Sequence, residues 1–69
     1  MTQKELNYVE DAIGHEQTII KILEFTKENI QDEELKNFIE NEYNIHTSMK
    51  EYLLNMLEGK TNEWWIINE

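Results

Sequence analysis

The sequence predicts an all-α protein, an antiparallel hairpin of two long helices that dimerises into a four-helix bundle. Two observations predict this fold. Apolar residues recur at helical spacing along two segments, and the 69 residues include no proline and two glycines, which argues against a turn-rich β-sandwich or barrel. The absence of cysteine excludes disulfides and thiolate zinc sites, so neither can support the small core of a single domain of this length.

The first helix is predicted over about residues 3–30. Thr2 and Glu5 have the spacing of a capping box, in which the Thr side chain caps the helix and the Glu side chain reaches back to the cap. Gly14 lies inside this segment, where glycine indicates close packing or simple tolerance. One apolar stripe is interrupted by Glu16 and Lys27, and it contains Leu6, Val9, Ile13, Ile20, Leu23 and Ile30. A neighbouring stripe widens the apolar face, and it contains Tyr8, Ala12, His15, Ile19, Ile22 and Thr26.

The second helix is predicted over about residues 33–58. Asp32 is a suitable N-cap, and Gly59 is a suitable residue to end the helix. One stripe at helical spacing contains Leu35, Phe38, Glu42, Ile45, Met49, Tyr52 and Met56. A second stripe beside it contains Ile39, Tyr43, His46, Leu53 and Leu57. Residues 1–60 are therefore assigned to the helical hairpin.

A short aromatic tail follows over residues 61–69. Trp64 and Trp65 are followed by two isoleucines, and an apolar cluster of this kind favours burial away from water. We expect the tail to pack on the open end of the bundle. If it stays outside, it forms a contact site for another protein.

A second copy of the hairpin is the partner that the apolar pattern predicts. A short connection makes the two helices antiparallel neighbours, yet each carries two adjacent apolar stripes and the hairpin itself has one seam. A two-fold dimer covers the second stripe of each helix. The residues expected in these interfaces are Leu6, Val9, Ile13, Ile20, Leu23, Phe38, Ile45, Met49, Tyr52, Met56, Trp64 and Trp65.

The charge of the chain excludes several classes of partner. Six lysines against fifteen acidic residues give a net charge of −9, which disfavours binding to nucleic acid or to an anionic membrane surface. No signal peptide and no apolar run of ~20 residues are readable, so a cytoplasmic location is expected. There is no arginine, no Gly-rich phosphate loop and no Ser/His/Asp arrangement, so no enzyme activity and no cofactor are expected.

Glu16, Glu42 and His46 are polar residues within the apolar stripes, and together they suggest a metal site as an alternative. Counting back from a turn near residues 31–32 places Glu16 level with about residue 47, beside His46, and Glu42 precedes His46 by one helical turn. Duplicated by a two-fold axis, these residues would supply the carboxylates and imidazoles of a di-iron or di-manganese site, with His15 as an additional ligand. Equally, both glutamates can lie at the stripe edge and pair with a lysine or histidine.

The stretch from Tyr8 to Trp65 resembles the spore coat protein F-like proteins, small ferritin-like helical proteins of spore-forming bacteria. The similarity lies in the segment 42–46, which reads Glu-Tyr-Asn-Ile-His, in Met49 and the run 52–57 that follow, and in the Trp64-Trp65 pair. The resemblance implies a ferritin-like bundle with a structural role in the spore coat, where other coat proteins would be its partners. The His follows Glu42 by four residues, whereas ferritin-like metal sites have Glu-x-x-His.

Three functions are therefore consistent with the sequence. The first is a non-catalytic structural or assembly protein that acts as a homo-oligomeric bundle. The second is a small metal-binding bundle that uses iron or manganese. The third is an acidic adaptor whose apolar groove receives a helix of a partner protein.

Overall fold

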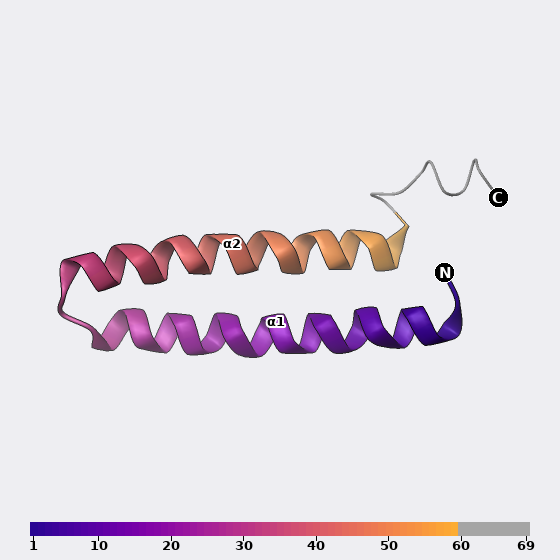
Figure 1. The fold of residues 1–69 in the computed structure, drawn as a ribbon, viewed down its shortest axis with the longest axis horizontal. Coiled ribbons are helices and arrows are strands. Elements are labelled where there is room, and N and C mark those ends of the chain that lie inside the picture. Colours follow the sequence, from indigo (N-terminus) through magenta and orange to yellow (C-terminus); the bar gives the residue numbers. More distant parts are fainter. Residues whose placement is uncertain (60–69) are drawn as a thin grey trace.

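The computed structural model describes residues 1–59, which form two antiparallel α-helices joined by a short connection (Figure 1). Helix α1 spans Gln3–Asn29 and helix α2 spans Glu33–Glu58. The predicted all-α hairpin is confirmed, with α1 ending one residue earlier than the sequence pattern suggested. The expected packing of the tail, including Trp64 and Trp65, lies outside the described residues.

Helix α1 begins at the predicted capping box. The Thr2 hydroxyl accepts the backbone N–H of Glu5 at 3.1 Å, and the Glu5 carboxylate accepts the backbone N–H of Thr2 at 2.8 Å. These hydrogen bonds satisfy N–H groups that have no partner within the helix. The hydrogen bond from the Thr2 backbone N–H lowers the pKa of the Glu5 carboxyl, because it favours the charged form.

Both ends of helix α2 are also fixed by caps that the sequence predicted. Asp32 accepts the backbone N–H of Leu35 at 2.9 Å. Glu33 and Glu34 lie in the first turn, where the positive end of the helix dipole stabilises their negative charges. At the other end Gly59 has φ 74, and its N–H bonds to the carbonyl groups of Asn55 and Met56. Glycine adopts this left-handed conformation without the steric cost of a Cβ atom.

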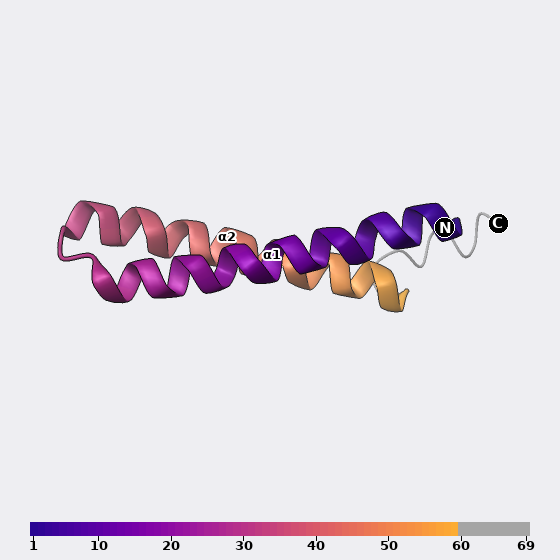
Figure 2. The same cartoon turned by 90° about the horizontal axis from the view of Figure 1, so that it is seen from below.

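The core of the hairpin is one narrow seam between the two helices. Its most buried residues come from α1, where Ile13, Glu16 and Ile20 are each 8% exposed. Figure 2 shows the two helices crossing near their middles. No side chain of the described residues is fully buried. Two helices side by side form a layer one helix thick, and such a layer has no enclosed interior.

The residues expected at interfaces divide between this seam and the surface. The α1 residues Leu6, Val9 and Leu23 are half-buried, and Ile13 and Ile20 are covered by the other helix of the same chain. On α2, Met56 is half-buried, whereas the others are exposed, namely Phe38, Ile45, Met49 and Tyr52. One seam can cover one stripe of each helix, so the α2 stripe that contains Phe38 and Ile45 remains open.

Gly14 offers a direct test of the sequence interpretation. A Cβ atom added there would meet nothing within 4 Å, so glycine is tolerated at this exposed position and is not required for close packing. We expect Gly14→Ala to raise the free energy of unfolding by about 1 kcal/mol, because alanine has the higher helix propensity. Urea denaturation of both proteins at equal concentration measures this change. A destabilised variant would contradict the open environment of Gly14.

Candidate functional site: a buried glutamate–histidine cluster

The three residues that the sequence singled out meet in the middle of the hairpin. The Nδ1 atom of His46 lies 2.6 Å from Oε2 of Glu16, which joins the two helices. The Nε2 atom of His46 lies 4.0 Å from Oε1 of Glu42, one turn earlier on α2. The predicted convergence of Glu16, Glu42 and His46 is therefore what the structure shows.

Burial makes the Glu16–His46 contact the central polar interaction of the hairpin. The Glu16 side chain is 10% exposed and that of His46 is 21% exposed. A carboxylate removed from water must be hydrogen-bonded, and the imidazole supplies that partner. Nδ1 is the ring nitrogen of His46 that makes this contact with Oε2 of Glu16. The Nε2 atom is then directed toward Glu42.

Glu42 lies at the edge of this cluster. Its side chain is 33% exposed, and it belongs to the α2 stripe that contains Phe38 and Ile45. The i, i+4 spacing brings Glu42 and His46 to neighbouring positions on one side of the helix. His15, the additional ligand candidate, is exposed and has no interaction with the cluster in the described structure.

The geometry of a single chain does not test the predicted iron or manganese site, which needs residues of two copies. Within one chain, residues 1–59 contain no group of three or more His, Asp or Glu side chains placed to hold a metal ion. The cluster does bring two carboxylates to one imidazole, and each ring nitrogen faces a different carboxylate. The contact between Glu16 and His46 forms a polar link between α1 and α2.

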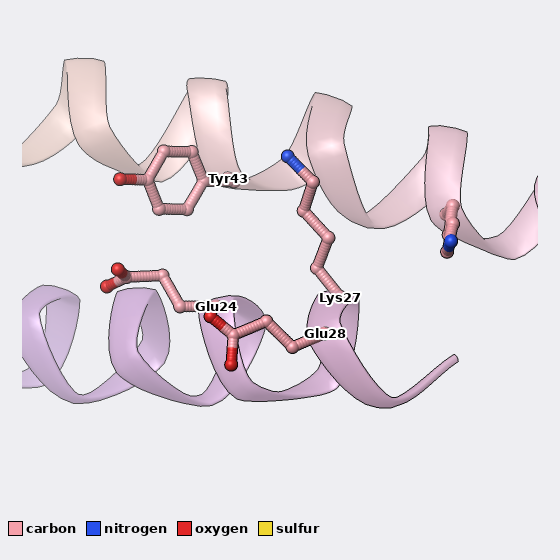
Figure 3. A pocket seen from close by; sticks show the side chains of 5 residues that line it. Glu24, Lys27, Glu28 and Tyr43 are labelled. Carbon is pink, nitrogen blue, oxygen red and sulfur yellow. The ribbon is translucent and has the colours of Figure 1, made fainter. Parts of the chain in front are cut away.

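A second polar region lies near the connection between the helices and was not anticipated. An open groove of about 470 Å³ is lined by Glu24, Lys27, Glu28, Lys36 and Tyr43, and Figure 3 shows four of these side chains spanning the two helices. The Nζ atom of Lys27 forms an ion pair of 2.7 Å with Glu40, and this contact raises the pKa of the Lys27 amine. The paired atoms are exposed, so the groove resembles a solvated surface and not a binding site.

The ion pair explains how a lysine fits in an apolar stripe. Lys27 interrupts the stripe near the end of α1, and its side chain reaches across to α2 and stays about half exposed. The methylene stem can cover apolar surface while the amine remains in water. The sequence pattern located Lys27 near the seam, but its spacing carried no signal for Glu40 as the partner.

Comparison with protein-family models, with curated proteins and with solved structures finds no match to this chain. No helix within residues 1–59 is long and apolar enough to cross a membrane. The class that the fold and the site define is a two-helix hairpin whose helices are linked by a partly buried glutamate–histidine contact.

Proposed function

We propose that this chain is a non-catalytic structural protein that assembles with itself, two hairpins forming a four-helix bundle. The observation that carries the proposal is a set of large apolar side chains left open by the hairpin. Each is between 44% and 68% exposed. We call this set the apolar face, and it comprises Tyr8, Ile22, Phe25, Leu35, Phe38, Ile45, Met49 and Tyr52.

Helical periodicity gathers these side chains on one broad side of the hairpin. The stripe of α1 that contains Tyr8 and Ile22, and the stripe of α2 that contains Phe38 and Ile45, both lie on the same side of the two-helix layer. By the same periodicity the groove lies on the other side, where side chains of α1 such as Glu24 and Glu28 and of α2 such as Tyr43 line it (Figure 3). The hairpin is therefore amphipathic as a whole, with one apolar side and one polar side.

The exposed area matches what an interface requires. Phe and Tyr side chains each bury about 150–250 Å², so the four aromatic residues of the apolar face offer roughly 450 Å². The four aliphatic residues raise the total to roughly 750 Å², close to the ~800 Å² that each partner contributes to a standard interface. A monomer rarely exposes a contiguous apolar patch of this size without a function for it.

A second copy fits this face better than an unrelated partner. On α2 the stripe from Leu35 to Tyr52 repeats at alternating spacings of three and four residues, the pattern by which helices pack along their length. Two copies that meet through the apolar faces direct their polar sides outward. The like charges of two −9 chains are then kept apart across the bundle.

Thermal unfolding measured at several protein concentrations tests this proposal. The folded dimer and unfolded monomers differ in molecularity, so a hundredfold rise in concentration is expected to raise the melting temperature by roughly 5–10 °C. The measurement is circular dichroism at 222 nm in cells of different path length. A melting temperature that does not change over this range would contradict self-association.

The resemblance to the spore coat protein F-like proteins supports a more specific form of the proposal. It makes the assembled bundle a component of the spore coat, with other coat proteins as its neighbours. Support comes from the 42–46 segment and Met49. An antibody against the chain, applied to separated coat and core fractions of spores from the source organism, tests it. Signal confined to vegetative cytoplasm would contradict this location.

A further inference from the structure

We infer that Glu42 and His46 form one half of a zinc site, which the same two residues of a second copy complete. The inference rests on the proposed self-association, because one chain supplies two ligands and zinc takes four in a closed site. It differs from the di-metal alternative in its metal, its single ion and its ligands. Here Glu16 is a positioning residue that does not touch the metal.

The ring of His46 lies between two carboxylates. Nδ1 is 2.6 Å from Oε2 of Glu16 and Nε2 is 4.0 Å from Oε1 of Glu42, so Glu16 holds one side of the ring and Nε2 faces Glu42. A cation between Nε2 and Oε1 would bind a nitrogen and an oxygen donor, both of which are zinc ligands. A carboxylate that holds the far nitrogen of a metal-binding histidine is a common arrangement in zinc proteins, where it fixes the orientation of the ring.

The distance between the two donor atoms is close to that in a zinc site. Zinc bonds to histidine nitrogen and carboxylate oxygen are about 2.0–2.2 Å, so two ligands of a tetrahedral site are about 3.4 Å apart. The separation of 4.0 Å between Nε2 and Oε1 closes to this value with a shift of about half an ångström. The Glu42 side chain is one-third exposed, so it can make this shift without disturbing the seam.

Two α2 helices can align across a two-fold axis so that their apolar stripes pair. If α2 packs antiparallel on the partner's α2 with Leu35 opposite the partner's Tyr52, Phe38 lies opposite the partner's Met49. All six stripe positions from 35 to 52 then pair with one another. In this alignment Glu42 lies opposite the partner's Ile45 and next to the partner's His46.

This alignment also creates a need for a cation. Glu42 is the one charged residue among the six paired positions, and the second copy covers it in the middle of the interface. Two carboxylates removed from water close to a two-fold axis are unfavourable without a positive charge between them. Two nitrogen and two oxygen donors in four-coordinate geometry suit Zn²⁺, and the −9 charge of each chain raises the local concentration of cations.

The experiment begins with protein stripped by a chelator and titrated with zinc chloride alone in an isothermal calorimeter. We expect one zinc ion per two chains. Replacing zinc with Co²⁺ is expected to give the intense visible absorption of a tetrahedral site. Glu42→Gln is expected to weaken zinc binding at least tenfold, because a carboxamide is a poor zinc ligand. Glu51→Gln, an equal charge change at an exposed position of the same helix, is expected to bind zinc as the unmodified chain does.

The outcomes separate this inference from the proposed self-association. A dimer that forms without zinc and takes up none overturns the zinc site and leaves self-association standing. Zinc bound equally by both glutamine variants also overturns the site, because Glu42 would then not be a ligand. A chain that stays monomeric with and without zinc overturns both. Circular dichroism of each variant shows that any loss of zinc binding is not a loss of helix.

Discussion

Replacing His46 with leucine is expected to destabilise the hairpin by about 3 kcal/mol, the largest effect of any single change in the seam. Within residues 1–59, His46 is the partner of the Glu16 carboxylate, which lies 2.6 Å from the ring and is 10% exposed, and the leucine removes it. A buried carboxylate without a hydrogen bond carries its full desolvation cost. Urea denaturation at one fixed protein concentration measures the loss.

The matched control for this prediction is the double variant Glu16→Leu/His46→Leu. Removing both polar groups leaves no unpaired charge, so the double variant is expected to be as stable as the unmodified chain or more stable. The two changes would thus be strongly non-additive, as expected for residues in contact. If His46→Leu does not fold at all, recovery of helix in the double variant still demonstrates the coupling. A double variant no more stable than His46→Leu would contradict the assigned role of the contact.

Placing a charge on the apolar face is expected to separate the two copies. Ile45 is 44% exposed in the hairpin, so Ile45→Glu has a small effect within one chain. In the dimer the new carboxylate would be covered and would face its own copy, at a cost of several kcal/mol. We expect the dimer dissociation constant to rise about a hundredfold or more. Sedimentation equilibrium over a range of concentrations measures it.

Asn44→Glu is the matched control for Ile45→Glu. It adds the same charge at the neighbouring residue, which is exposed and lies away from the apolar stripe of α2. This variant is expected to associate as tightly as the unmodified chain. Equal weakening by both changes would show that net charge, and not the apolar face, controls association. If both variants associate as tightly as the unmodified chain, the interface lies elsewhere on the hairpin.

The sequence predicted the hairpin well because its signals are local. Thr2 and Asp32 cap helices through residues three positions away, and Gly59 ends a helix through its own backbone conformation. The meeting of Glu16 with His46 was also predictable, because a short connection between two straight helices leaves one register. Simple counting located this contact to within one residue.

Other features depend on interactions that a periodic pattern does not encode. Periodicity allowed two positions for Glu16, as a ligand in the interior or as a charge at the stripe edge. The structure shows that its side chain is buried, which agrees with the interior position. The Lys27–Glu40 ion pair depends on how far two flexible side chains reach across the groove. On α1, the stripe containing Ile13 and Ile20 is buried by α2, so the residues left open are those of the neighbouring stripe, such as Tyr8 and Ile22.

The mass of the chain in solution tests the central claim most directly. Sedimentation equilibrium of the full chain at micromolar concentration, with and without a chelator, gives this mass independently of molecular shape. Self-association through the apolar face predicts about 16.8 kDa, twice the 8.4 kDa of one chain. A mass of 8.4 kDa at every concentration would contradict the claim, and the apolar face would then be the groove of an adaptor for a partner helix.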